Sequence, residues 1–185
     1  MTNIYLLRHE DRESSPRFMS SLTPTGFAKL PALYQKLQDL NIQVIYSSPF
    51  LRTLQTIYKF AKYNHLKIRV EYALYEHYNI PSRYMKYSVH RLLIDYPYLF
   101  EVIEPCYTSF IKYDQLDLKE TLRQKTYRIK SFMDHLLHTE AVEAAASVPP
   151  RNILIVTHRD VIDTLMNIDD QNIVQPGNLI KYHRP

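Results

Sequence analysis

Apolar and polar positions along the chain fall into short apolar runs, separated by longer segments with helical spacing. The runs are rich in branched residues and do not alternate with polar ones, which predicts strands that are buried on both faces. In the longer segments, apolar residues recur every three or four positions, as on the buried face of a helix. The strands are expected at about residues 3–7, 42–46, 68–72, 153–157 and 178–182.

The helices are expected at about residues 23–40, 49–63, 118–145 and 161–166. Thr23-Pro24 is typical of a helix start, because a capping residue precedes a proline in the first turn. Pro31 lies inside this first helix, so a kink or a later start stays open. The buried stripes are expected to include Phe27 in the first helix and Leu122 in the third. Strands that alternate with helices predict an α/β fold, a three-layer α/β/α sandwich with a mostly parallel central sheet.

Residues 77–116 interrupt this alternation, with prolines at positions 81, 97 and 105. We expect a cap-like insertion there, partly helical around residues 81–94. A chain of 185 residues is typical of one domain, so residues 1–185 are expected to form a single domain that carries the insertion. Four basic residues of the insertion either line a substrate cap or form its solvated face: Arg83, Lys86, His90 and Arg91.

The chain contains only two glycines, Gly26 and Gly177. A P-loop and a dinucleotide-binding fingerprint both need clustered glycines, so both are excluded. Any phosphate that the protein binds must therefore be held mostly by side chains. His135 and His138 are spaced for a metal site, but no third ligand accompanies them, which favours an exposed helix face and no metal.

The net charge of +4 suits anionic partners but is too small to indicate nucleic acid. No apolar stretch reaches the length of a membrane span, and the start of the chain lacks the apolar run of a signal peptide. The single cysteine, Cys106, cannot form an internal disulfide. These features predict a cytoplasmic protein with neither a membrane nor a nucleic acid as partner, and they leave its oligomeric state open.

Chemistry-bearing residues follow the expected strands at both ends of the chain. Arg8-His9 ends the first strand, and His158-Arg159 ends the fourth. The carboxyl ends of parallel strands meet at one edge of a sheet, so these pairs are expected to lie close together. Arginine forks suit a phosphoryl dianion, and a neutral imidazole can attack phosphorus. The sequence therefore predicts a site that binds an anion and transfers it.

Two further positions complete this hypothesis. Arg52 begins the second helix, where the helix dipole also favours an anion. Glu76 follows the third strand and can protonate the leaving oxygen as a general acid. Glu71 is near, and the sequence does not exclude that either glutamate merely forms a surface ion pair.

Five motifs now resemble those of the histidine phosphatase superfamily, which has the phosphoglycerate mutase-like fold. In this chain they read Leu6-Leu7-Arg8-His9-Glu10, Leu22-Thr23-Pro24-Thr25-Gly26, Ser47-Ser48-Pro49-Phe50-Leu51-Arg52-Thr53-Leu54-Gln55-Thr56, Leu74-Tyr75-Glu76 and Val156-Thr157-His158-Arg159. They occur in the family's order and leave only residues 77–116 uncovered. Five motifs in order are far more specific than any one of them.

The resemblance implies a role for each residue. His9 would be the nucleophile that forms a phosphohistidine, and Glu76 would be the proton donor. Some branches write the first motif as Arg-His-Gly-Glu-Arg, and Arg12 matches the position of its last arginine. The phosphoryl group is expected to bind Arg8, Arg12, Arg52 and His158. This chemistry requires neither a metal nor an organic cofactor.

Two positions depart from the family's pattern. Glu10 stands where the family usually has glycine or another small residue, and Arg159 stands where glycine often follows the second histidine. A Glu10 carboxylate that faced the site would repel phosphate, whereas one that faced away, or paired with Arg12 or Arg159, would leave the site intact. The leading hypothesis is therefore a phosphatase for a phosphorylated small molecule or phosphoprotein. A silenced phospho-ligand binding or scaffold module is the alternative, and a phosphoglycerate mutase-type phosphotransferase is less favoured because the insertion is short.

Overall fold

The computed structural model describes residues 2–14, 18–77, 88–117, 119–146, 149–168 and 174–183. The strands are β1 (Asn3–Arg8), β2 (Val44–Ser47), β3 (Ile68–Val70), β4 (Asn152–Thr157) and β5 (Leu179–Tyr182). The helices are α1 (Pro24–Gln38), α2 (Leu51–Tyr63), α3 (Val89–Asp95), α4 (Leu122–Ala145) and α5 (Arg159–Met166). Short 3₁₀ helices are η1 (Tyr72–Leu74), η3 (Pro97–Glu101) and η4 (Tyr113–Gln115).

The strands form one mostly parallel sheet in the order β3-β2-β4-β1-β5, with β5 alone antiparallel to its neighbour. This confirms the predicted α/β fold. In the register, Arg8 lies opposite Thr157, and Ser47 lies opposite Val156. The carboxyl ends of β1, β2 and β4 therefore meet at one edge of the sheet. The residues that follow these three strands are brought together there.

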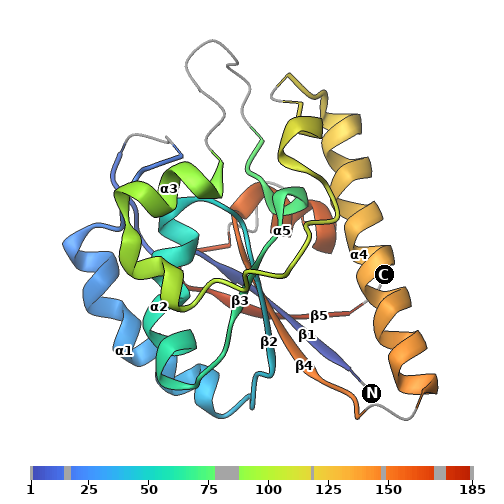
Figure 1. The fold of residues 1–185 in the computed structure, drawn as a ribbon, viewed down its shortest axis with the longest axis horizontal. Helices are drawn as coiled ribbons and strands as arrows, with labels where there is room; N and C mark the ends of the chain where they lie inside the picture. The colour runs from blue at the N-terminus through green and yellow to red at the C-terminus, as the bar shows by residue number, and fades with distance from the viewer. Residues whose placement is uncertain are drawn as a thin grey trace.

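The helices cover both faces of the sheet (Figure 1). Helices α1, α2 and α3 pack over one face, where Leu7, Ile45 and Leu154 contribute to a buried cluster. Helices α4 and α5 pack over the other face, against Leu6 and Ile155. Burial on both faces explains the unbroken apolar runs of β1 and β4. No helix in the described part of the chain combines the length and the hydropathy that crossing a membrane would require.

The start of α1 is fixed by its own sequence. The Thr23 hydroxyl accepts a hydrogen bond from the Gly26 backbone N–H at 3.0 Å, and Pro24 occupies the first turn. A Cβ at Gly26 would overlap the carbonyl oxygen of Asp11. Glycine at this position therefore lets α1 approach the loop that follows His9. The helix continues through Pro31 without ending there.

Two predicted core positions are wrong. Phe27 is 43% exposed and Leu122 is 63% exposed. In α1, the close approach of Gly26 to the loop turns the buried face toward Leu30, which leaves Phe27 outside it. In the long helix, Leu122 is the first residue of α4, which begins four residues later than expected.

Part of the expected insertion packs on the core at the β3 edge. Leu92 and Leu99 are fully buried there, and Ile103 pairs with Ile68 of β3 in an isolated bridge. The expected helix at about residues 81–94 is observed as α3, and residues 78–87 lie outside the described residues. Arg83 and Lys86 fall in that range.

Candidate active site

His9 and His158 face one another where β1 and β4 end. Their ring centroids are 5.3 Å apart, and both side chains are buried. The His9 backbone N–H donates to the Thr157 carbonyl at 3.0 Å, which extends the pairing of the two strands by one residue. The parallel register therefore places the two imidazoles together, as the sequence predicts.

The hydrogen bonds of His9 define its neutral form. The Nδ1 atom lies 2.7 Å from the Glu10 backbone carbonyl, and the Arg52 Nε–H donates to Nε2 at 3.2 Å. A carbonyl only accepts, so Nδ1 carries the proton and Nε2 presents a lone pair. Burial, followed by the charge of Arg52, holds the pKa of His9 well below its ordinary value. His9 is therefore a neutral imidazole whose Nε2 lone pair accepts a hydrogen bond from Arg52.

Arg52 joins the members of this site. It lies in the first turn of α2, is fully buried, and pairs through Nη2 with the Glu76 carboxylate. The same Nη2 is 3.4 Å from Nδ1 of His158, and the Glu76 Oε1 is 3.9 Å from that nitrogen. We call His9, Arg52, Glu76 and His158 the histidine cluster. Only the Glu76 side chain, 19% exposed, reaches solvent appreciably within it.

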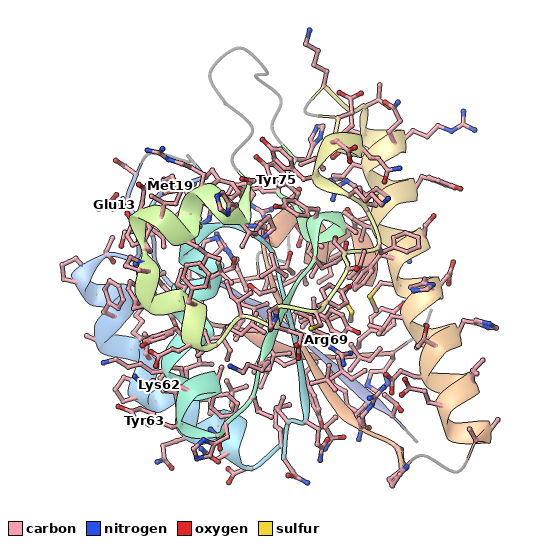
Figure 2. All side chains as sticks on the ribbon, viewed as in Figure 1. Glu13, Met19, Lys62, Tyr63, Arg69 and Tyr75 are labelled. Carbon is pink, nitrogen blue, oxygen red and sulfur yellow. The ribbon has the colours of Figure 1, made fainter. Side chains whose placement is uncertain are left out.

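The Phe50 ring packs against two members of the histidine cluster. The Arg52 Cζ lies 4.4 Å from the centre of the Phe50 ring, and the His158 ring packs against it at 4.7 Å. Tyr75 packs on the same ring at 4.5 Å. In Figure 2, Tyr75 lies at the end of the molecule that also carries Glu13 and Met19. An aromatic wall thus fixes the orientation of the guanidinium and of one imidazole.

His158 is held by a residue that sequence reasoning did not assign. The Ser48 hydroxyl lies 2.8 Å from Nε2 of His158. Ser48 belongs to the motif that ends β2, so its position was a usable signal. Burial, then the charge of Arg52, holds the pKa of His158 well below its ordinary value. Its ring is therefore also neutral.

Arg8 and Arg12 lie beside the cluster rather than in it. Arg8 donates to the Val174 carbonyl, and its Nε has no hydrogen-bond partner among the described residues. Burial, then the charge of Arg159, lowers the pKa of Arg8. Arg12 donates to the backbone carbonyls of its own loop, including that of Glu13 at 2.7 Å. The charge of Arg12 nevertheless acts on both histidines.

Glu10 points toward β5 and away from the cluster. A Cβ at Gly177, in the turn before β5, would overlap the Glu10 carboxylate. Lys29 is the charged residue that acts most strongly on Glu10, and burial raises the pKa of the carboxyl. Arg52 and His158 lie on the opposite side of β1, toward β4 and β2. The sequence leaves this orientation open, and in the structure the Glu10 carboxylate lies against Gly177.

Arg159 takes part in a local ion pair. Its Nε donates to Asp163 at 3.1 Å, one turn further along α5. Its charge acts on Arg8, so it contributes to the positive field at this edge of the sheet.

The two glutamates after β3 have different places. Glu71 is fully buried and accepts hydrogen bonds from five groups, which are Ala73 N, Tyr107 Oη, Ser109 Oγ, Phe110 N and Ile111 N. It thereby ties residues 107–111 to η1. Glu76 lies in the histidine cluster. Glu71 is therefore a buried anchor for residues 107–111, and Glu76 is the glutamate that lies beside the two histidines.

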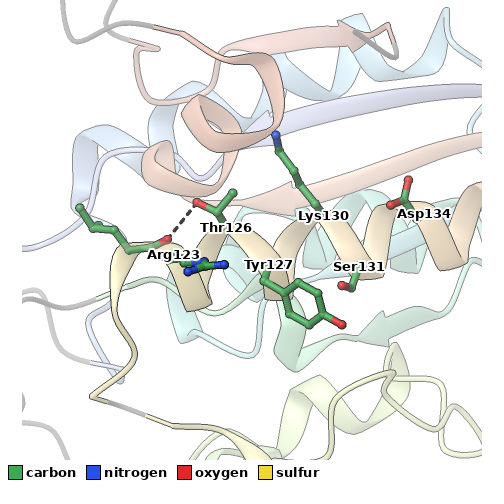
Figure 3. Close-up of a pocket in the computed structure, with 7 residues that line it drawn as sticks. Arg123, Thr126, Tyr127, Lys130, Ser131 and Asp134 are labelled. Carbon is green, nitrogen blue, oxygen red and sulfur yellow. Dashed lines mark hydrogen bonds between the residues drawn. The ribbon is translucent and has the colours of Figure 1, made fainter.

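A hollow of about 570 Å³ lies elsewhere, along the outer face of α4 (Figure 3). All the residues that line it come from α4, and no member of the histidine cluster is among them. His135 and His138 also lie on α4, and the described residues contain no group of three side chains suited to hold a metal. This surface therefore shares no residue with the histidine cluster.

The family model of the histidine phosphatase superfamily (branch 1) matches residues 4–171, which is most of the chain. The chain belongs to the histidine phosphatase superfamily. Branch membership agrees with the order of the motifs and with the juxtaposition of His9 and His158. No curated protein sequence matches this superfamily member closely enough to add to that.

Solved structures of phosphatases share the fold. The ecdysone phosphate phosphatase of Bombix mori, in complex with tungstate, is 14% identical with a TM-score of 0.71, covering 97% of this chain and 88% of its own. The mycobacterial glucosyl-3-phosphoglycerate phosphatase is 16% identical with a TM-score of 0.61, covering 98% and 89%. The phosphoserine phosphatase of Entamoeba histolytica, in complex with 3-phosphoglyceric acid, is 17% identical with a TM-score of 0.63, covering 98% and 90%. At these identities the likeness establishes the fold.

Proposed function

We propose that this chain is a phosphatase that hydrolyses a phosphomonoester through a phosphohistidine on His9. The observation that carries the proposal is the state of His9. Its Nδ1 proton is held by a backbone carbonyl, and its Nε2 lone pair lies 3.2 Å from the Arg52 guanidinium, opposite His158. A nucleophile for phosphorus needs this neutral form beside a group that attracts the phosphoryl dianion.

In the first step, the Arg52 Nε–H exchanges the Nε2 lone pair of His9 for an oxygen of the phosphoryl group. The released lone pair forms a bond to phosphorus while the bond from phosphorus to the leaving oxygen breaks. Glu76 gives its proton to that oxygen, which leaves as an alcohol. In the second step, water attacks phosphorus and the N–P bond breaks. Glu76 takes the water's proton, phosphate departs, and His9 is again neutral.

Glu76 must change partner for this to happen. Its carboxylate pairs with Arg52 in the structure. An incoming phosphoryl dianion competes for the same guanidinium, because it carries more charge and offers a matching pair of oxygens. A carboxylate displaced beside a dianion is driven to take up a proton. Substrate binding itself would therefore load the proton donor.

The phosphoryl group is proposed to bind Arg8, Arg12, Arg52 and His158. The Arg8 Nε, which has no hydrogen-bond partner within the described ranges, supplies an available donor. Arg12 would have to leave the carbonyls of its loop to reach the group. Because side chains provide the nucleophile, the acid and the cations, the proposed reaction needs neither a metal nor a cofactor.

The substrate is proposed to be a phosphorylated small molecule. The structural neighbours include phosphatases named for ecdysone phosphate, phosphoserine and glucosyl-3-phosphoglycerate, and all three substrates are of this class. A phosphoprotein remains within the same chemistry. Residues 77–116 are the proposed cap of a single domain and would select among such substrates, in a protein proposed to act in the cytoplasm.

The alternative of a silenced binding module depends on Glu10. That hypothesis needs the carboxylate to occupy or repel the dianion site. The Glu10 side chain instead lies against Gly177, on the β5 side of β1. This orientation supports catalysis over a module that only binds.

The test is release of inorganic phosphate from p-nitrophenyl phosphate. We expect turnover by the wild-type chain, loss of it in His9→Ala, and no loss in the matched control His138→Ala, whose imidazole is exposed on α4. Rapid acid and alkali quenching should trap an acid-labile, alkali-stable phosphoryl group that is absent from His9→Ala. Undiminished turnover in His9→Ala, or a folded wild-type chain without turnover, would overturn the proposal. A mutase reaction is tested separately, since it would isomerise 3-phosphoglycerate and be stimulated by a bisphosphate primer.

A further inference from the structure

Asp160 lies in the first turn of α5, two residues after His158, and sequence reasoning gave it no role. Its Oδ2 accepts a hydrogen bond from the His77 backbone N–H at 3.0 Å. His77 directly follows Glu76, so this bond ties the backbone behind the proposed proton donor to the helix that begins after His158. The other oxygen, Oδ1, is buried and has no hydrogen-bond partner among the described residues.

The charges around Asp160 come from two directions. Burial raises its pKa to about 6, and the negative charge of Glu76 acts in the same sense. Lys125 and Arg128 of α4 face it with positive charge and oppose the shift. The charge of Glu76 therefore acts on Asp160, although the two carboxyl groups belong to different elements.

Other contacts hold the same segment less directly. Arg128 donates to the Ala73 carbonyl of η1 and pairs with Glu120. The His77 side chain lies 3.5 Å from that Glu120. These contacts anchor η1 and the His77 ring. The Asp160 hydrogen bond holds the peptide group that joins Glu76 to His77, and it thereby helps to fix the direction in which the Glu76 side chain projects from the backbone.

We propose that Asp160 is a positioning residue for the proton donor: its carboxylate accepts from the His77 N–H and so fixes the backbone behind Glu76. The inference rests on the proposed phosphatase activity and adds a second carboxyl to it. It assigns no contact between Asp160 and substrate. Among the steps up to loss of the leaving group, it therefore predicts a defect only where that group must be protonated.

Two substitutions test this role. Asp160→Asn keeps an oxygen that can accept from the His77 N–H, whereas Asp160→Ala removes it. Asp134→Asn, on the outer face of α4 in Figure 3, is the matched control. Each variant is compared with wild type on p-nitrophenyl phosphate, whose leaving group departs without a proton, and on glycerol 2-phosphate, whose leaving group needs one.

For Asp160→Ala, we expect kcat/KM on glycerol 2-phosphate to fall about 10-fold or more, because a misplaced acid loses much of its contribution. On p-nitrophenyl phosphate, kcat/KM should change less than about 3-fold, because this constant covers only the steps up to loss of the leaving group and leaves out the later step in which Glu76 takes the water's proton. For Asp160→Asn, kcat/KM on glycerol 2-phosphate should stay within about 3-fold of wild type, since the amide oxygen can still accept from the His77 N–H. Asp134→Asn should match wild type.

Equal losses of kcat/KM on the two substrates would overturn the inference, because a merely structural residue affects both substrates alike. If Asp160→Ala does not fold, Asp160→Asn decides, and a loss of kcat/KM on glycerol 2-phosphate of about 10-fold or more in that variant, which keeps the acceptor oxygen, refutes the positioning role. Absence of turnover in the wild-type enzyme would overturn the proposed function, and this inference with it. Wild-type turnover with equal losses of kcat/KM on both substrates overturns the inference alone.

Discussion

Gly177→Ala tests the contact that keeps Glu10 out of the histidine cluster. Gly177 has φ +72°, a left-handed conformation that costs an alanine about 1–2 kcal/mol. The new Cβ would also overlap a Glu10 carboxylate oxygen and lie 2.7 Å from the carboxyl carbon. Forcing a buried group out of such an overlap costs about 1–3 kcal/mol. The single variant should therefore lose about 2–5 kcal/mol of its free energy of unfolding.

The double variant Glu10→Ala with Gly177→Ala isolates the overlap. Removing the carboxylate leaves only the backbone cost at position 177, about 1–2 kcal/mol. Glu10→Ala alone should change stability by no more than about 1 kcal/mol, because lost packing is opposed by the removal of a buried carboxyl whose Oε2 has no hydrogen-bond partner among the described residues. The double-mutant cycle should show a favourable coupling of about 1–3 kcal/mol.

The assay is urea unfolding followed by circular dichroism, with phosphate release measured on the same samples. The Gly177 N–H donates to the Arg8 carbonyl at 3.1 Å and contacts the His9 carbonyl at 3.3 Å, so a displaced turn should also lower turnover. If the Glu10 carboxylate simply swings away, Gly177→Ala would lose only the backbone contribution. The two substitutions would then be additive within about 0.5 kcal/mol, and that result would refute the reasoning.

Three further predictions concern the cluster and its support. Burial keeps His158 neutral in the folded state, so below about pH 6.5 the unfolded chain binds more protons than the folded one, and the free energy of unfolding decreases as the pH is lowered. His158→Asn should reduce this pH dependence by up to about 1.4 kcal/mol per pH unit. Identical pH dependence in the variant and the wild type would contradict the prediction. Arg52→Lys keeps the positive charge but loses the planar guanidinium that bonds both His9 and Glu76. The value of kcat/KM should therefore fall about 10- to 150-fold for each charge-assisted hydrogen bond that is lost. An unchanged kcat/KM would show that Arg52 is not part of the site. Glu71→Gln places an amide NH₂ among the groups that now donate to the buried carboxylate. The variant should lose about 1–3 kcal/mol of its free energy of unfolding in urea. No loss would be expected if Glu71 were a surface residue.

The sheet and the meeting of the two histidines could be predicted because both follow from local pattern. A buried apolar run specifies a parallel strand, and parallel strands deliver their last residues to one edge. Nothing beyond β1, β4 and their register is needed to bring His9 beside His158. Arg52 followed for the same reason, since it begins the helix after β2.

The positions of Arg12 and Glu71 could not be predicted in the same way. Arg12 bonds carbonyls of its own loop, and loop geometry has no periodic signal in sequence. Glu71 is buried because residues 107–111 fold back onto it, and those residues lie in the segment where the hydrophobic pattern is weakest. Phe27 failed for a related reason: helical spacing places a stripe only approximately, and contact with the Asp11 loop decided which side is buried.

Glu10 stands at a position where this family usually has glycine or another small residue, and its backbone makes the contacts there. Its carbonyl accepts a hydrogen bond from the His9 ring, and its N–H donates to the Thr56 hydroxyl at 3.1 Å. Its φ is not among the positive values of the described chain, so the backbone itself does not require glycine. What a side chain at position 10 needs is space, and here the turn before β5 provides it because residue 177 has no Cβ. A Cβ at residue 177 would overlap the Glu10 carboxylate where it lies, so the place of this carboxylate beside the His9 segment depends on glycine at 177.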